Sequence, residues 1–466
     1  MLFSSSFFLT FFLPIVLLSY WLAPNRFRNP LLLFISLSFY AWGEPLFVFV
    51  LICMTAVNFW FIRQLDQSTN RKRWLIGYLV LNIGFLVAFK YVNFIVANLG
   101  YLAGQTVTND FPVIPLPLGI SFYAFHAITY GIDVYRRTFS AQNRIDDFAL
   151  YLFLFPHQIA GPIVTYQSIA AEIQTRTFNV SYITEGMYRF TIGLAKKVIL
   201  SNGLILLLKS CQEQQLIHDS STLVWVEIVA YTLHIYFDFS GYSDMAIGLG
   251  RIFGFHFPEN FNKPYTSKSI TEFWQRWHKS LGYFMKNYLY IPLGGNRLSA
   301  KRTYFNLFIV FFLSGLWHGA SWNFVLWGMF HGCWLILERL FLGKWLQKAG
   351  IISVLWTILL VMHGWVFFHE VTLTDSISTF KLLWSFDFQS IPIVNHATYF
   401  MFLLAIGIGL IVLEFFPVLS RWRLTWTHSE KGVFQLSRAV WMVLLYVLSY
   451  AYIVAGSYNP FIYFNF

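Results

Sequence analysis

The stretch Ser314–Ala320 reads SGLWHGA and joins two long apolar runs, residues 304–317 and 321–342. It places His318 at a depth where a polar side chain is costly unless it faces a cavity or a partner. The glycines on both sides of the histidine have no side chain, so another backbone or a ligand can come close. We therefore interpret His318 as a candidate functional residue. It is either a general base in a buried pocket or a histidine held by structural hydrogen bonds.

The composition is that of a protein whose main solvent is lipid. Of the 466 residues, 57% are hydrophobic and 11% are charged, whereas soluble domains carry about 25% charged residues. The net charge of +11 comes from bases in short loops between apolar runs. This is the positive-inside pattern of membrane proteins, and we expect no nucleic-acid partner. The cysteines at 53, 211 and 333 have neither disulfide-framework nor zinc-site spacing.

Apolar runs of near-spanning length recur along the whole chain and predict an all-α polytopic membrane protein with roughly 10–13 passes. We expect one membrane domain over residues 1–466, with a C-terminal transmembrane extension over 390–466. The first run is predicted to be retained as a helix, because no basic region precedes it. The runs lie near residues 6–23, 30–62, 74–104, 115–135, 145–164, 183–210, 221–240, 304–317, 321–342, 351–369, 398–418 and 436–455.

Proline and glycine interrupt three of the apolar stretches, namely VIPLPLGISFY (113–123), FPHQIAGPIV (155–164) and FSGYSDMAIGLG (239–250). Broken helices at membrane depth are tolerated only inside protein or beside a water-filled cavity, so these stretches predict re-entrant segments around a cavity. His157 and Gln158 in the second stretch are candidates to line a tunnel. We favour the alternative that they hydrogen-bond the backbone groups freed by the break.

Two carboxylates, Asp238 and Asp244, stand in an otherwise apolar region and must be paired, hydrated or functional. We expect them to form ion pairs with the bases of segment 262–303, with a proton or ion pathway as the alternative. His234 and Asp238 are four residues apart and could form half a metal site. The 12 histidines show neither HxH nor HExxH nor Cys/His spacing, so we expect no bound metal.

Segment 262–303 carries eight bases and the single acid Glu272. This excess predicts a cytoplasmic, interfacial or re-entrant helical hairpin. Ser269 or Thr271 is the predicted N-cap of its first helix. His278 is the second candidate functional residue, and the alternative is that it only anchors this interfacial helix. On a continuous helix, one face would carry Trp274, Trp277, His278 and Leu281.

Several long motifs in this order resemble the membrane-bound O-acyltransferase (MBOAT) family, and within it the branch that O-acetylates polysaccharides such as alginate and peptidoglycan. The resemblance covers nearly the whole chain. It rests on MLFSSSFFLTFFLP at the start, PLGISFYAFHAITYGIDVYR (117–136), FPHQIAGPI, YFDFSGYSDMAIGLGRIFGFHFPENFNKPY (236–265), SITEFWQRWHKSL (269–281), YLYIPLGGNR (288–297), GLWHGASWNFVLWGMFHG (315–332) and SYNPFIYFNF at the end.

This resemblance implies a ring of helices around a central funnel and tunnel, with the invariant histidine of the family at His318 and its second motif histidine at His278. It implies an O-acyltransferase of the bacterial inner membrane that takes an acetyl group from a cytoplasmic donor, acetyl-CoA, which is a substrate and not a bound cofactor. The group would then reach an extracytoplasmic polysaccharide through a periplasmic SGNH-type acetyltransferase or an acyl-carrier protein.

The donor site is less defined. Trp274, Arg276, Trp277, Lys279 and Trp317 are candidates to bind the donor, because bases suit the phosphates of coenzyme A, as they equally suit lipid phosphates. One position departs from the family pattern: His369 stands where that pattern has an arginine, and we assign it no role. The alternatives are D-alanyl transfer to teichoic acid, an acyl acceptor that is a lipid or a protein, and a transporter with broken helices.

Overall fold

The computed structural model describes residues 1–104, 114–176, 179–213, 220–388, 397–416, 432–456 and 461. In these ranges every regular element is a helix, which confirms the all-α expectation. The chain forms two compact units, one of Met1–Met187 with Ala246–Pro258 and the other of Tyr188–Met245 with Glu259–Phe466. A single membrane domain stays a prediction, as do the ring and the tunnel.

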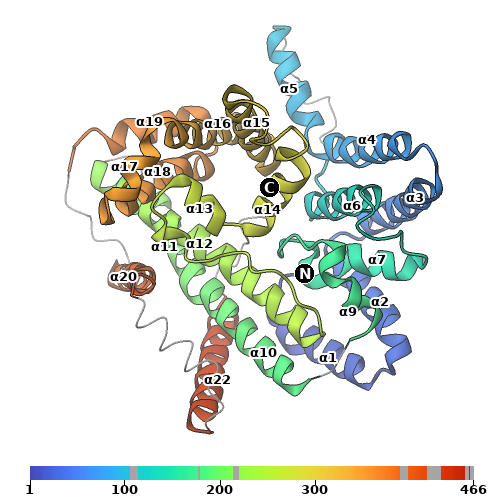
Figure 1. Cartoon of the computed structure of the whole chain (residues 1–466). Helices are drawn as coiled ribbons and strands as arrows, with labels where there is room; N and C mark the ends of the chain where they lie inside the picture. Colours follow the sequence, from blue (N-terminus) through green and yellow to red (C-terminus); the bar gives the residue numbers. More distant parts are fainter. Residues whose placement is uncertain are drawn as a thin grey trace. The chain divides into compact units, whose positions relative to one another are not determined.

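The first unit is built around α6 (Ile120–Tyr135), in which every residue from Ile120 to Gly131 is buried. The Tyr78 hydroxyl of α4 donates to the carbonyl of Ala127 on α6 at 2.7 Å. The other helices of this unit are η1 (Phe8–Phe12), α1 (Leu13–Leu22), α2 (Asn25–Gly43), α3 (Phe47–Gln67), α4 (Arg71–Lys90), α5 (Val92–Leu102), α7 (Ile145–Phe153), α8 (Phe155–Gln158), α9 (Tyr166–Gln174) and the start of α10 (Val180–Ala195) (Figure 1).

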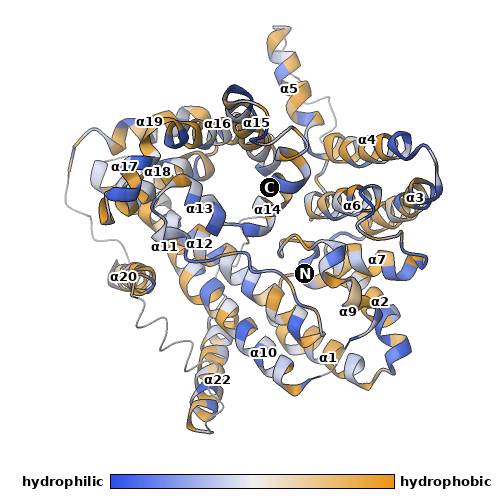
Figure 2. Cartoon of the chain, in the orientation of Figure 1, coloured by the Kyte–Doolittle hydropathy of each residue, from blue (hydrophilic) through white to orange (hydrophobic). Residues whose placement is uncertain are grey.

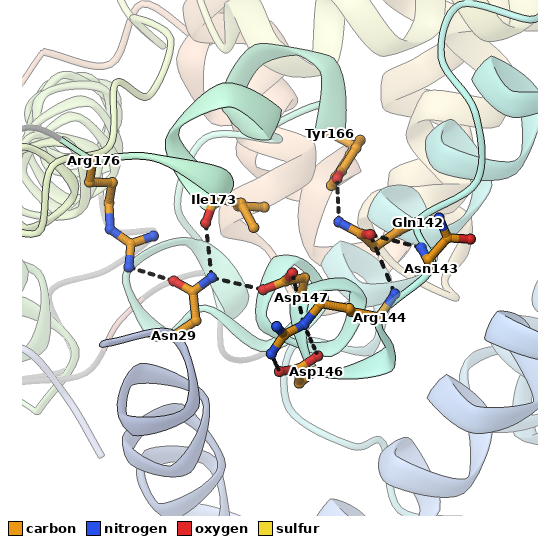
Figure 3. A network of polar contacts seen from close by, with 9 residues as sticks. All are labelled: Asn29, Gln142, Asn143, Arg144, Asp146, Asp147, Tyr166, Ile173 and Arg176. Carbon is orange, nitrogen blue, oxygen red and sulfur yellow. Dashed lines mark hydrogen bonds and ion pairs between the residues drawn. The ribbon is translucent and has the colours of Figure 1, made fainter. Parts of the chain in front are cut away.

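A polar network joins α2, α7 and α9 in this unit (Figure 3). The Asn29 amide donates to the Asp147 carboxylate at 2.8 Å and to the carbonyl of Ile173 at 2.9 Å. Its oxygen accepts from Arg176. A side-chain amide that uses both ends in this way fixes the start of α7 and the end of α9, the two helices on either side of the FPHQIAGPIV break.

The second unit contains the stretches that carry the candidate site. Its helices are the end of α10, η2 (Lys196–Ser201), α11 (Asn202–Glu213), α12 (Ser221–Ile252, which ends in the first unit), η3 (Pro264–Thr266), α13 (Ile270–Arg276), α14 (Lys279–Phe284), η4 (Met285–Tyr290), α15 (Ala300–His318), α16 (Trp322–Leu337), η5 (Glu338–Leu342), α17 (Gly343–Lys348), α18 (Ile351–His369), α19 (Leu373–Leu383), α20 (Ala397–Leu413) and α22 (Gly432–Val454).

Helix α12 runs without a break through FSGYSDMAIGLG, so the expected interruption at 239–250 is wrong. Glycine serves here for close packing. A Cβ atom on Gly241 would lie 2.7 Å from the carbonyl oxygen of Gly193 on α10, and one on Gly193 would lie 2.4 Å from that of Gly241. The other two predicted breaks are present in the described residues, with Gly119 in a left-handed conformation (φ 72°) ahead of α6 and a non-helical chain after Gln158.

Six described helical stretches are long and apolar enough to cross a membrane: Phe47–Gln67, Arg71–Lys90, Val180–Lys209, Trp322–Lys348, Ile351–His369 and Gly432–Val454. Figure 2 shows α4 and α20 largely in the orange of apolar residues. The protein is therefore multi-pass, and the count of ten to thirteen passes stays a prediction. Helices α6 and α12 are not among the six. Both are buried over long stretches, and α12 carries charged residues.

Candidate active site

Residues Ser314–His318 of the SGLWHGA stretch form the last turn of α15, and His318 is its final residue. Gly319 has an extended backbone, and α16 begins three residues later at Trp322. The two helices pack closely because glycines face backbone at their crossing. A Cβ atom on Gly315 would lie 2.2 Å from the carbonyl oxygen of Phe324. The tight α15–α16 hairpin thus fixes the position of the histidine.

The His318 ring is buried, with 3% of its surface exposed, and aromatic side chains form its walls. Its centroid lies 4.7 Å from that of Trp317, 5.0 Å from that of Trp327 and 5.0 Å from that of Phe368. The walls come from three helices, α15, α16 and α18. In such a dry, low-dielectric setting, hydrogen bonds and charges act more strongly than in water.

His278 lies at a break between two short helices, which corrects the prediction of a continuous amphipathic helix. Helix α13 ends at Arg276, and α14 begins at Lys279. His278 itself has a left-handed backbone, with φ 45° and ψ 54°. The predicted start is right for Ser269, whose hydroxyl accepts from the backbone N–H of Glu272 at 3.0 Å.

A loop from the end of the α12 region holds His278 in this conformation. The backbone N–H of Lys279 donates to the carbonyl of Asn260 at 2.9 Å, and that of Asn262 donates to the carbonyl of Arg276 at 2.9 Å. The Asn260 side chain also contacts the His278 Nδ1 at 3.0 Å. Asn260 was not singled out in the sequence, because its partner lies 18 residues away across a turn.

The structure brings the two candidate histidines to one indole. The His278 ring centroid lies 6.2 Å from that of Trp317, which in turn lies 4.7 Å from that of His318. Trp317, one of the candidate donor-binding residues, therefore lies against both histidine rings. The 40 residues that separate them in sequence fold back through α14, η4 and α15 to make this arrangement.

The remaining donor-binding candidates divide into two groups. Trp274 and Trp277 are part of the aromatic cluster, with Trp274 5.3 Å from Trp327 between ring centroids. Arg276 is occupied within the hairpin, because it pairs with Glu272 and donates to the Thr266 hydroxyl at 2.6 Å. Lys279 differs from Arg276, since its ammonium group has no ion-pair partner among the described residues.

Both buried aspartates form ion pairs, but with α10 and η2 and not with the bases of 262–303 as expected. Asp238 lies 2.5 Å from Lys197, and these two side chains are 0% and 1% exposed. Asp244 lies 2.7 Å from both Arg189 and Lys196. The close approach of α10 and α12 at their glycines explains the choice of partners. It brings the bases of α10 and η2 next to α12.

Ser201, His234 and Asp238 lie together but are not arranged as a nucleophilic triad. The His234 Nδ1 lies 3.0 Å from the carbonyl oxygen of Ser201, which can only accept, so Nδ1 carries the hydrogen. The Ser201 hydroxyl donates to Asp238 at 3.2 Å. The histidine therefore cannot take the serine proton through Nδ1. Among the described residues, no three His, Cys, Asp or Glu side chains gather in a way that could hold a metal ion.

His157 and Gln158 do not bond the freed backbone as we favoured. Both are buried, and within the described chain neither ring nitrogen of His157 and neither end of the Gln158 amide has a hydrogen-bond partner on another residue. The freed N–H of Val164 instead donates to Nε2 of His126 at 3.2 Å. The rings of His126 and His157 touch, with centroids 4.6 Å apart.

Two further histidines lie close to the site. His369, to which we assigned no role, lies 2.7 Å from the buried carboxylate of Glu227. His331 was missed, although its Gly-x-x-His-Gly setting repeats that of His318. Its ring packs on Trp327 at 5.0 Å, on the same indole that His318 contacts. The repeated spacing is the sequence signal that could have found it.

Comparisons with known proteins give a family and several named relatives. The model of the membrane-bound O-acyltransferase family matches residues 139–377. A probable alginate O-acetylase of Pseudomonas putida is 38% identical over the whole of both chains. A peptidoglycan O-acetyltransferase of Helicobacter pylori is 32% identical over 82% of this chain and 79% of its own. A teichoic acid D-alanyltransferase of Bacillus subtilis is 26% identical over 53% of this chain and 64% of its own.

Proposed function

This chain belongs to the membrane-bound O-acyltransferase family and is a membrane O-acyltransferase, and from that premise we propose that it transfers acetyl groups from acetyl-CoA on the cytoplasmic side to a polysaccharide on the other side. The observation that carries the proposal is the pair of buried histidines against Trp317. Alginate and peptidoglycan are the first acceptors to test, because relatives similar over most of their length are named for them.

We assign the proton transfer to His318. When a hydroxyl attacks the thioester carbonyl, a C–O bond forms, the C–S bond breaks, and the hydroxyl proton must leave. A positioned imidazole accelerates such a step by about 10²–10⁴-fold. His318 is the last residue of α15, and the carbonyl end of a helix stabilises a positive charge there. The imidazolium formed then returns its proton to the departing thiolate.

We assign His278 to the orientation of the donor or of the acyl carrier. The His278 ring packs near Trp317, the residue before His318, and is nearly fully buried. The aromatic walls serve the same reaction, because a site that excludes water protects an acyl group from hydrolysis. Lys279 follows His278 directly and has its charge available for a phosphate of the donor.

Delivery across the membrane is part of the proposal. The acetyl group would leave to a periplasmic SGNH-type acetyltransferase or an acyl-carrier protein, and the enzyme would reside in the inner membrane. D-Alanyl transfer to teichoic acid is the alternative within the family. The relative named for it covers only about half of this chain, at 26% identity. A radiolabelled acyl donor of each kind, offered to the same membranes, separates the two.

The test is acetyl transfer by His318→Ala and His318→Gln in membrane vesicles, followed as thiol release from [14C]acetyl-CoA and as O-acetyl content of the glycan by mass spectrometry. We expect both readouts to fall at least 10²-fold at unchanged protein level. His363→Ala is the matched control, since this histidine lies on α18 with its ring on Trp384 instead. Wild-type acetylation in the His318 variants would refute the proposal.

A further inference from the structure

We propose that Asn260 is a positioning residue for His278: it fixes the imidazole in the tautomer that carries hydrogen on Nδ1, so that Nε2 is the nitrogen presented to the reacting group. The inference deepens the proposed function and rests on it for the use made of Nε2. The tautomer itself follows from hydrogen bonds within the second unit. It concerns a residue outside the SGLWHGA and RWHKSL stretches.

The orientation of the Asn260 amide is fixed by its partners. The backbone N–H of Ser280 donates to Oδ1 at 3.3 Å, and the Ser280 hydroxyl donates to the same oxygen at 2.9 Å. At the other end, Nδ2 donates to the Ser243 hydroxyl oxygen at 3.1 Å. A backbone N–H can only donate, so the amide atom that faces it must be the oxygen.

The amide orientation fixes the histidine in turn. The His278 Nδ1 lies 3.0 Å from this oxygen, which can only accept, so Nδ1 carries the hydrogen. In a neutral imidazole the second nitrogen then holds the lone pair. Burial lowers the pKa of His278 to about 3, so the ring is neutral near pH 7. Nε2 is thus a hydrogen-bond acceptor that can orient a hydroxyl or thiol group of the donor or of the acyl carrier.

Asn260 also holds the backbone of the histidine. Its carbonyl accepts from the N–H of Lys279 at 2.9 Å, directly after the left-handed His278 (φ 45°). A non-glycine residue keeps such a backbone only when its surroundings impose it. One residue therefore sets both the ring tautomer and the direction in which the ring leaves the chain, which is the arrangement expected of a positioning residue.

The charges around Asn260 are already paired. Glu259 lies 2.6 Å from Arg189, and Asp244, next to Ser243, lies 2.7 Å from the same guanidinium group. The Asn260 amide is therefore an uncharged group next to carboxylates that already pair with Arg189. Replacing it with a carboxylate would place a negative charge directly on Nδ1, which favours the doubly protonated ring. Once protonated, Nε2 has lost its lone pair.

The test uses the expected rise in the pKa of His278 when a carboxylate replaces the amide. In Asn260→Asp, the new carboxylate raises the pKa of His278 by about 1–3 units. The pH below which the KM for acetyl-CoA rises should move to higher pH by the same amount, with recovery above it, because a protonated Nε2 no longer accepts a hydrogen bond from the donor. Each unit of displacement should raise this KM about tenfold on the acid side. Asn262→Asp is the matched control, because its exposed side chain lies in the same loop, and its profile should match that of the wild type.

A second measurement needs no change at position 260. Nitrogen-15 spectra of histidine-labelled wild-type protein in nanodiscs, compared with His278→Gln to identify the signal, report which ring nitrogen carries hydrogen. We expect hydrogen on Nδ1 and a lone pair on Nε2. Hydrogen on Nε2, or a pH profile of the KM for acetyl-CoA in Asn260→Asp that matches the wild type, would overturn the proposal. Full acetylation in His318→Gln would instead end the proposed function and leave the tautomer assignment standing.

Discussion

The buried ion pair of Lys197 and Asp238 gives the most decisive test of how the second unit is held together. The two side chains are 1% and 0% exposed, with 2.5 Å between nitrogen and oxygen. Removing one charge leaves the other buried without its ion-pair partner. Breaking such a pair costs about 3–5 kcal/mol, whereas removing both charges is often neutral. We therefore expect Asp238→Asn and Lys197→Met each to lower the free energy of unfolding by about 3–5 kcal/mol.

The double variant should recover most of that loss and unfold within about 1 kcal/mol of the wild type, because neither charge is then left alone. The Ser201 hydroxyl, which donates to Asp238 at 3.2 Å, keeps an acceptor in the asparagine oxygen. The free energy of unfolding is measured by titration with SDS in mixed micelles, with tryptophan fluorescence as the readout.

The matched control is the pair of Arg251 and Glu185, which lies 3.9 Å apart with side chains 34% and 50% exposed. Exposed pairs contribute about 0–1 kcal/mol, so Glu185→Gln should change little. The reasoning fails if Asp238→Asn unfolds within 1 kcal/mol of the wild type by this measure. It also fails if the double variant loses as much as the two single variants together.

Four further outcomes are expected. His278→Ala should reduce acetyl transfer but cost little when added to His318→Ala, since residues that act together are not additive; multiplied losses would contradict this. A cysteine at the exposed Leu298, in a cysteine-free background, should react with impermeant thiol reagents only after lysis if segment 262–303 is cytoplasmic. Burial lowers the pKa of His278 to about 3, well below its unfolded value of about 6.5, so between these pH values the unfolded chain binds one proton more than the folded chain. The free energy of unfolding should therefore fall as pH falls, by about 2 kcal/mol from about pH 6.5 to 5. His278→Gln should lack this contribution in SDS titrations at the two pH values. Gly241→Ala should lower the free energy of unfolding by about 1–3 kcal/mol or more, because its Cβ would meet a carbonyl oxygen at 2.7 Å that cannot move aside; unchanged stability would show that the two backbones can separate.

Local patterns in the sequence predicted features that depend on neighbouring residues, while the roles of the site residues stay predictions. His318 lies where the glycine-flanked motif placed it, and Ser269 caps α13 as its position ahead of an amphipathic run indicated. Both depend on interactions within a few residues, which a single sequence records directly. The resemblance implied that His278 and His318 belong to one site, and the structure places both rings against Trp317.

Long-range contacts account for what the sequence could not predict. The break at His278 depends on Asn260, which adds hydrogen bonds that no helical periodicity reveals. The FSGYSDMAIGLG stretch suggested a broken helix because glycine disfavours helices. In the structure, the missing side chain of Gly241 instead lets the backbone of α10 pack directly against α12. Asp238 and Asp244 pair with α10 and η2 for the same reason.

The contact between Gly193 and Gly241 has a mechanical consequence. The backbones of α10 and α12 are in direct contact, so sliding either helix along its axis would push a carbonyl oxygen into the opposite backbone. The ion pairs of Lys197 and Asp244 lie next to this contact and would have to break during such a movement. We therefore expect α10 and α12 to stay fixed relative to each other. If the site has to open to admit a bulky acyl donor, helices without such a backbone contact would have to move.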